Sequence, residues 1–158
     1  MTATRQKARW FVLLASGVCY LAALPLPALL FQREPPVRGI TALLWGWWGL
    51  FTGDFPWFAN PAYFLALFLV SLGLHKTVQL LCALAIGLGA RSLCVEKWYF
   101  NEAYGTPVTG LGPAFYLWMT SFGVLLVGAM VLQGFSRQSH REDRANPAVP
   151  PPPLVPRR

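Results

Sequence analysis

The sequence contains few charged residues. They make up 12% of its 158 residues, and only six residues are acidic. Average soluble domains carry about 25% charged residues. This shortage, together with a mean hydropathy of +0.45, argues against a water-facing surface and indicates a chain surrounded by lipid.

Residues that bind metals or attack substrates are also scarce. The three cysteines are Cys19, Cys82 and Cys94, and the sequence has two histidines. No CxxC pair or zinc-type spacing occurs, and an odd number of cysteines gives no complete disulfide framework. No acid, base or nucleophile stands in a catalytic pattern within the apolar segments. We therefore expect no enzymatic activity, no catalytic residue, no metal and no cofactor.

Four apolar segments predict membrane-spanning helices. A spanning helix needs about 20 mostly apolar residues, and each residue adds about 1.5 Å to its length. The sequence therefore predicts an all-α membrane protein with one transmembrane domain over residues 1–135. Its four transmembrane helices are expected at about 10–31, 56–74, 77–93 and 113–134.

The first apolar segment, residues 10–31, follows a basic stretch, as a signal peptide would. However, Val18 is bulky where a lipoprotein cleavage box before Cys19 needs a small residue, and no clear A-x-A site follows. An uncleaved first helix is therefore the preferred interpretation. Pro25 and Pro27 are expected to bend or end this helix, because proline lacks an N–H and clashes with the preceding turn.

The distribution of basic residues predicts the orientation of the chain. With four crossings and a cytoplasmic N-terminus, nine of the 13 basic residues lie inside, in agreement with the positive-inside rule. The four outside are Arg33, Arg38, Arg91 and Lys97. We therefore expect both termini in the cytoplasm. Orientation accounts for the basic excess, and no basic stripe is interleaved with aromatic residues, so no nucleic-acid partner is expected.

Residues 39–52 are apolar but too short to span a membrane. The stretch GITALLWGWWGLF would form a helix about 20 Å long. Tryptophan collects at the headgroup level of membranes, and this region holds Trp45, Trp47 and Trp48. We expect a short helix over residues 39–52, between the first and second spans, that is interfacial or re-entrant.

The second span has two candidate starting points. Asn60-Pro61 is a helix-start signal, with an N-cap residue followed by proline at the first helical position. A helix starting at Pro61 would begin below the outer surface, with Asn60 capping a free N–H and Asp54 facing its positive end. Alternatively, the helix begins at Pro56 and Pro61 kinks it.

A submerged helix start also holds small ions in transporters. The sequence therefore indicates an outward-facing pocket formed by Asp54, Trp57, Asn60 and Arg91. The preferred interpretation of these residues is structural, with Asp54 and Asn60 as caps and the tryptophans as interface anchors. A ligand-binding pocket is the alternative.

The last segment, residues 136–158, is polar and then rich in proline, and it ends in PPPPLVPRR. Such a composition cannot bury a core, so we expect a disordered, proline-rich cytoplasmic tail. It could also serve an SH3-like groove, but a solvated tail is the preferred interpretation.

Two features bear on association with other chains. Ala83-xxx-Gly87 and Ala85-xxx-Gly89 have the spacing that permits close helix contact, which we assign to internal packing in preference to a dimer. Cys94 lies outside the apolar segments, so it is a candidate for a disulfide with a second chain.

Three stretches of the sequence resemble a known group of proteins. They are GWWGLF…DFPWFANP, GLHK and TGLGPAFYLW, and they lie within residues 10–135. They resemble small uncharacterised bacterial integral membrane proteins with an F-x-W-x-A-N-P-like start to the second helix, a short basic turn after it and a glycine-rich approach to the last helix. The resemblance implies a bacterial inner membrane and the same four-helix topology. It supplies no activity and no site residues.

Together these features predict a small integral membrane protein that serves as a non-enzymatic accessory or interaction subunit. Its expected partners are the lipid bilayer and either another membrane protein or a second copy of the chain. The alternative is a small-solute carrier or lipid-binding protein that uses the outward-facing pocket near Asp54 and Asn60.

Overall fold

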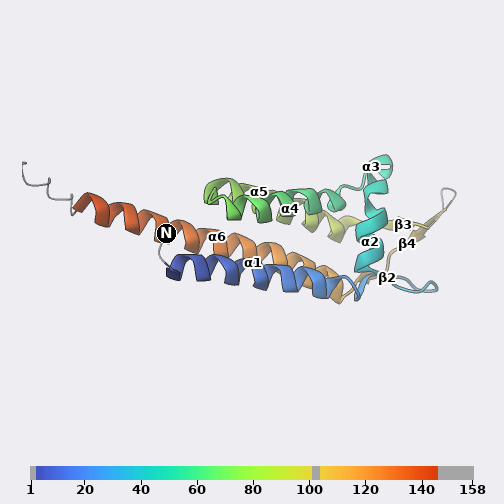
Figure 1. The fold of residues 1–158 in the computed structure, drawn as a ribbon. Helices are drawn as coiled ribbons and strands as arrows, with labels where there is room; N and C mark the ends of the chain where they lie inside the picture. The colour runs from blue at the N-terminus through green and yellow to red at the C-terminus, as the bar shows by residue number, and fades with distance from the viewer. Residues whose placement is uncertain (1–2, 101–103, 146–158) are drawn as a thin grey trace, which may run out of the picture.

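The computed structural model describes residues 3–100 and 104–145, and helices dominate its fold (Figure 1). Four helices form an elongated bundle: α1 (Ala3–Ala23), α4 (Ala59–Ser71), α5 (His75–Ala90) and α6 (Pro113–Ala145). Helix α6 packs against both α1 and α5, and α5 packs against α4.

Shorter elements connect these helices at one end of the bundle (Figure 1). Between α1 and α4 lie α2 (Gly39–Trp45), η1 (Gly46–Trp48), α3 (Gly49–Thr52) and η2 (Pro56–Phe58), and η3 (Arg91–Cys94) follows α5. Helix α2 runs across the ends of the bundle helices rather than along them.

The predominance of helix is consistent with the expectation of an all-α chain, and the described residues also form five short strands. Strands β1 (Pro27–Leu30), β2 (Val37–Arg38) and β5 (Gly110–Leu111) form an antiparallel sheet in the order β2-β1-β5, and β3 (Lys97–Tyr99) pairs with β4 (Gly105–Pro107). Near apolar surroundings, backbone N–H and C=O groups need protein partners. The connecting segments meet this need by pairing with one another.

The first helix differs from the prediction at both of its ends. In place of the predicted helix over 10–31, α1 begins at Ala3 and ends at Ala23. Its early start includes arginine, glutamine and lysine, which have good helix propensity. Pro25 and Pro27 end the helix rather than bend it, because a residue before proline is disfavoured in the α conformation. The chain then continues into β1.

The other helix boundaries differ by smaller amounts. The helix predicted at 56–74 is η2 followed directly by α4, and it ends three residues early. The helix predicted at 77–93 is α5 followed directly by η3. The predicted helix over 39–52 corresponds to α2, η1 and α3, which follow one another without a gap.

Helix α6 is longer than the predicted helix over 113–134. It continues to Ala145, so residues 136–145 of the predicted disordered tail are helical. This segment, SRQSHREDRA, contains several good helix formers, and extending an existing helix is easier than nucleating a new one. The rest of the predicted tail, residues 146–158, lies outside the described residues.

The core lies where the four bundle helices meet. Tyr63, Val78, Cys82, Phe122 and Leu125 are fully buried in it. These residues come from α4, α5 and α6, and Tyr20 on α1 packs against them.

Small residues on α5 have two different environments. Ala85 and Gly89 are buried, and a Cβ on Gly89 would lie 2.7 Å from Sδ of Met119 on α6. Ala83 and Gly87 are exposed, and a Cβ on Gly87 would meet nothing within 4 Å. The prediction of internal packing is therefore correct for the Ala85–Gly89 pair and wrong for the Ala83–Gly87 pair.

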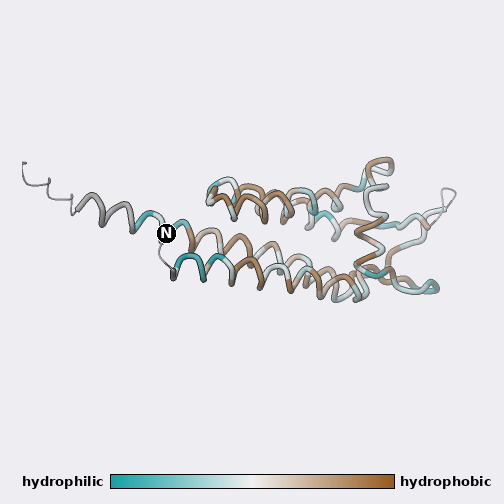
Figure 2. The backbone as a smooth tube through the Cα atoms, viewed as in Figure 1, coloured by the Kyte–Doolittle hydropathy of each residue, from teal (hydrophilic) through white to brown (hydrophobic). Residues whose placement is uncertain are grey.

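The outer faces of the bundle are apolar. Large apolar side chains are exposed on every bundle helix, and Figure 2 shows apolar residues along the length of the bundle with polar residues concentrated at its ends. Examples are Trp10, Phe11, Leu14 and Val18 on α1, Phe64, Leu65 and Phe68 on α4, Leu80 and Leu84 on α5, and Val127, Met130 and Val131 on α6.

Two segments, His75–Cys94 and Pro113–Gln138, are helices long and apolar enough to cross a membrane. Only 22% and 39% of their apolar windows are buried inside the protein. The core helix of a water-soluble fold is mostly buried. Burial in a protein core therefore does not account for most of the apolar surface on these two helices.

Candidate functional site

A cavity of about 150 Å³ lies at the end of the bundle where the connecting elements gather. Its lining comes from segments that are far apart in the sequence, including α1, β1, α2, η2, β3 and the start of α6. Most of the lining is apolar or aromatic, and we call it the aromatic cavity. Its tryptophans are Trp45, Trp48, Trp57, Trp98 and Trp118.

Asn60 organises the polar part of the aromatic cavity. Its side chain is only 5% exposed. Oδ1 accepts hydrogen bonds from the Tyr20 hydroxyl at 2.8 Å and from Nε1 of Trp118 at 2.9 Å, and Nδ2 donates to the Trp57 carbonyl at 2.9 Å. Asn60 therefore ties α1, α6 and η2 together and uses three of the four hydrogen bonds that an amide side chain can make.

Trp57 fixes α2 against η2. Its Nε1 donates to the Leu43 carbonyl at 2.6 Å, and a Cβ added to Gly46 would lie 2.8 Å from Cδ1 of its ring. A Cβ added to Gly49 would collide with the carbonyl oxygen of Asp54. The glycines in GWWGLF are therefore required for close approach of the segment that follows them.

Asp54 is held by local contacts at the edge of the aromatic cavity. Its Oδ2 accepts a hydrogen bond from the Thr52 hydroxyl at 3.3 Å, and its N–H donates to the Gly49 carbonyl at 2.8 Å. These contacts close the turn after α3. Lys97 from β3 also lines the cavity, so the lining carries one acidic and one basic side chain.

The structure brings three of the four predicted site residues together. Asp54, Trp57 and Asn60 line the aromatic cavity, whereas Arg91 is exposed on η3 and is not part of the lining. Two lining residues, Tyr20 and Trp118, were missed by the sequence analysis. Both carry a polar atom on an aromatic ring inside an otherwise apolar helix, and such atoms usually have a hydrogen-bond partner when buried. That signal could have found them.

Asn60 does not cap a helix. Helix η2 begins at Pro56 and α4 follows from Ala59, so Pro61 lies inside the first turn of α4. The N-cap residue of α4 is Phe58, without a side-chain cap hydrogen bond. The start at Pro56 is therefore correct, and the capping role predicted for Asn60 is wrong. Pro61 is tolerated because the N–H groups of a first turn lack partners within the helix.

A second polar group lies within the helix bundle. Ser16 Oγ donates to the Ser121 carbonyl at 2.8 Å and lies 2.7 Å from the Tyr63 hydroxyl, all at buried positions. The Ser71 and Ser121 hydroxyls, by contrast, donate to carbonyls of their own helices. Ser16 joins α1 to α4 and α6.

The aromatic cavity combines a mainly apolar lining with a few polar groups. Three of the four hydrogen-bonding positions of the Asn60 amide are used by protein groups. A mainly apolar lining with a few polar groups fits the apolar part of an amphipathic ligand. No known family model, curated protein or solved structure matches the sequence. The function must therefore be inferred from the cavity, the exposed apolar faces and the distribution of charge.

Proposed function

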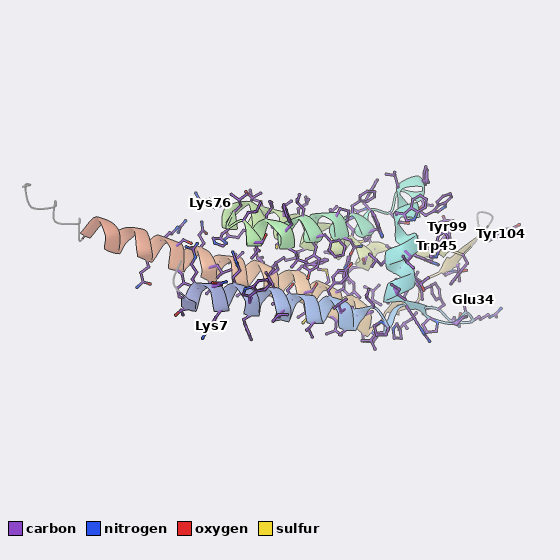
Figure 3. The ribbon with its side chains drawn as sticks, in the orientation of Figure 1. Lys7, Glu34, Trp45, Lys76, Tyr99 and Tyr104 are labelled. Atoms are coloured by element: carbon purple, nitrogen blue, oxygen red, sulfur yellow. The ribbon has the colours of Figure 1, made fainter. Side chains whose placement is uncertain are left out.

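We propose that the chain crosses the bacterial inner membrane four times, with both termini in the cytoplasm. The exposed apolar faces of all four bundle helices support this, because soluble monomers rarely expose large contiguous apolar patches. Lys7 and Lys76 lie at one end of the bundle and Glu34 at the other (Figure 3). By the positive-inside rule, the end with the lysines faces the cytoplasm and the aromatic cavity faces outward.

The length of α4 supports a position of the aromatic cavity within the outer leaflet. Its 13 residues extend about 20 Å, against about 30 Å of hydrocarbon. In the proposed orientation, the start of α4 lies below the outer membrane surface, beneath α2 and α3. A ligand can enter the cavity beside it directly from the lipid.

On this placement, the protein binds an amphipathic lipid of the outer leaflet and does not alter it chemically. The single observation that carries this function is the aromatic cavity, which is mainly apolar and has Asp54 and Lys97 in its lining. Engineered apolar cavities of about 150 Å³ bind benzene. The cavity therefore holds a chain end or one ring, while the rest of the lipid lies along the apolar exterior.

A photo-crosslinking experiment tests this function. The full chain is reconstituted in nanodiscs with a phosphatidylethanolamine that carries a diazirine at its acyl-chain end, and crosslinked peptides are mapped by mass spectrometry. Ala42 is half buried in the lining, so Ala42→Phe fills the cavity. We expect this variant to reduce crosslinks to the lining residues about fivefold, equivalent to about 1 kcal/mol.

The matched control is Ala22→Phe. Ala22 is exposed on α1 near the same end and lies outside the lining, so its substitution should leave the crosslinks unchanged. Crosslinks spread evenly over the outer faces of the bundle, or equal yields from both variants, would contradict lipid binding in the cavity.

A second candidate function, as an accessory or interaction subunit, rests on the β3–β4 hairpin. The hairpin projects beyond the bundle and carries exposed aromatic residues, including Tyr99, Phe100 and Tyr104 (Figures 1 and 3). Aromatic residues are enriched at protein interfaces. A photo-crosslinking amino acid at Tyr104 in native membranes should capture one stoichiometric protein, either another membrane protein or a second copy of this chain. Capture of lipid alone would exclude this function.

A further inference from the structure

A second group of polar residues lies at the end of the bundle opposite the aromatic cavity. We call Arg5, Arg9 and His75 the cationic cluster. Nη2 of Arg5 donates to Ser136 Oγ at 2.5 Å and lies 3.4 Å from Nε2 of His75. Nη1 of Arg9 donates to the Ser71 carbonyl at 3.0 Å, and both guanidinium groups act electrostatically on the His75 ring. The cluster therefore joins α1, the α4–α5 turn and α6.

Two buried donors in the cationic cluster have no partner. Among the described residues, Nε of Arg9 and Nδ1 of His75 are the buried side-chain nitrogen or oxygen atoms without a hydrogen bond. A guanidinium group can only donate, so Arg5 makes Nε2 of His75 the acceptor and leaves the ring proton on Nδ1. His75 is 7% exposed, and a buried donor without a partner is costly. Both unsatisfied groups therefore call for an acceptor.

Acidic side chains do not supply that acceptor in the described part of the chain. Its acidic residues with described side chains are Glu34, Asp54 and Glu96, and they belong to the connecting segments at the far end of the bundle. Figure 3 shows Glu34 at the end opposite Lys7 and Lys76. Among the side chains that the structure describes, the cationic cluster at the edge of the apolar bundle therefore has no acidic partner, and an external anion would satisfy its charge.

We propose that the cationic cluster binds the phosphate of an anionic phospholipid in the cytoplasmic leaflet. Basic pockets between helices on that side of a membrane suit such headgroups. Nη1 of Arg9 is occupied by the Ser71 carbonyl, so the Nε edge of its guanidinium fork remains for a phosphate oxygen pair. Neighbouring protein atoms cover Nε, so the Arg9 side chain shifts to admit the phosphate. This site is separate from the aromatic cavity and shares only the membrane orientation with it.

Native mass spectrometry of the detergent-purified full chain tests the proposal. Retention of dioleoylphosphatidylglycerol is compared with retention of dioleoylphosphatidylcholine. We expect one phosphatidylglycerol to be retained in preference, and Arg9→Gln to weaken its binding roughly fivefold. The matched control is Lys7→Gln, which removes the same charge from an exposed position on the same helix and should change binding less than about twofold. Arg9→Lys keeps the charge but loses the fork, so it should bind between wild type and Arg9→Gln.

Three results would overturn the proposal. Equal retention of the two lipids by the wild-type protein would overturn it, and this result does not depend on whether the variants fold. An equal loss in Lys7→Gln and Arg9→Gln would show a diffuse charge effect instead of a site. Displacement of phosphatidylglycerol by an equal concentration of inorganic phosphate would assign the site to the free ion. The Ala42→Phe variant should retain phosphatidylglycerol normally, which separates this site from the aromatic cavity.

Discussion

Replacement of Asn60 by alanine should destabilise the protein strongly. The substitution removes two accepted hydrogen bonds, from Tyr20 and Trp118, and one donated to Trp57. At about 0.6 kcal/mol for each interhelical bond in a membrane, the loss is about 2 kcal/mol. The substitution leaves the hydroxyl of Tyr20 and the indole N–H of Trp118 as buried donors without this partner. Counted in this second way, at about 1–3 kcal/mol for each donor, the loss is about 2–6 kcal/mol. The Trp57 carbonyl keeps a backbone partner in the N–H of Ala59.

A double-mutant cycle isolates this contribution from the small cavity that alanine creates. Tyr20→Phe keeps the ring that stacks on Tyr63 at a centroid distance of 5.0 Å and removes only the hydroxyl. Tyr20→Phe should lower the free energy of unfolding by only about 0.6–1.5 kcal/mol, because Oδ1 of Asn60 still accepts a hydrogen bond from Trp118. With the Tyr20 hydroxyl already absent, Asn60→Ala should cost at least about 1 kcal/mol less than in the wild-type background.

The assay is reversible unfolding in mixed micelles with increasing dodecyl sulfate, followed by tryptophan fluorescence. A free energy of unfolding within about 0.5 kcal/mol of wild type for Asn60→Ala would refute the reasoning, since surface substitutions alone produce changes of that size. Strict additivity of Tyr20→Phe and Asn60→Ala would refute the hydrogen bond between them.

Further substitutions probe the bundle itself. In the same assay, Gly89→Leu should lower the free energy of unfolding by about 1–3 kcal/mol, because a side chain there meets Met119 and Trp118. Gly87→Leu should leave the free energy of unfolding unchanged or raise it by about 0.5–1 kcal/mol. Equal effects of the two substitutions would contradict the orientation of α5. Ser16→Ala should lower the free energy of unfolding by about 1–2 kcal/mol because it removes the buried hydrogen bond with the Tyr63 hydroxyl, and the loss should be smaller when Tyr63 is already phenylalanine. Ser71→Ala is the control, because the Ser71 hydroxyl is exposed and bonds within its own helix. If Ser71→Ala lowered the free energy of unfolding as much as Ser16→Ala, this would argue against the interhelical hydrogen bond of Ser16.

The sequence predicted the existence of the bundle helices better than their ends. Apolar composition and length identified each of the four, because a bilayer and a helix both impose a minimum apolar run. The end of α1 depended on whether Pro25 and Pro27 bend or stop a helix, and that is decided by the pairing of β1 with β2 and β5. Such strands of two to four residues carry no periodic pattern of their own, so they could not be predicted.

The α4–α5 turn shows the same limit at a finer scale. The GLHK stretch correctly indicated a short connection, but its histidine, His75, is a buried residue of α5 rather than a turn residue. A polar residue close to a glycine normally indicates solvent, whereas His75 contacts Arg5, which lies 70 residues away on another helix. Contacts across this many residues leave no local trace in one sequence.

The candidate site was predicted in part for a comparable reason. Asp54, Trp57 and Asn60 lie close together in the sequence, so local reasoning could group them. Tyr20 and Trp118 belong to different helices, and their convergence on Asn60 depends on how α1 and α6 pack. Arg91 was assigned by its place at a helix end, but its direction around the helix axis depends on packing as well.

The proposed orientation of the chain in a membrane underlies both proposed sites, and Cys94 allows a direct test of it because Cys94 is exposed at the aromatic-cavity end. Spheroplasts are treated with a maleimide that cannot cross the inner membrane. We expect the wild-type protein to be labelled in intact spheroplasts and Cys94→Ser not to be labelled, because Cys82 is buried and Cys19 lies within α1. Lys7→Cys in the Cys94→Ser background should be labelled only after lysis. Labelling of Lys7→Cys before lysis, or protection of Cys94 in intact spheroplasts, would contradict the orientation.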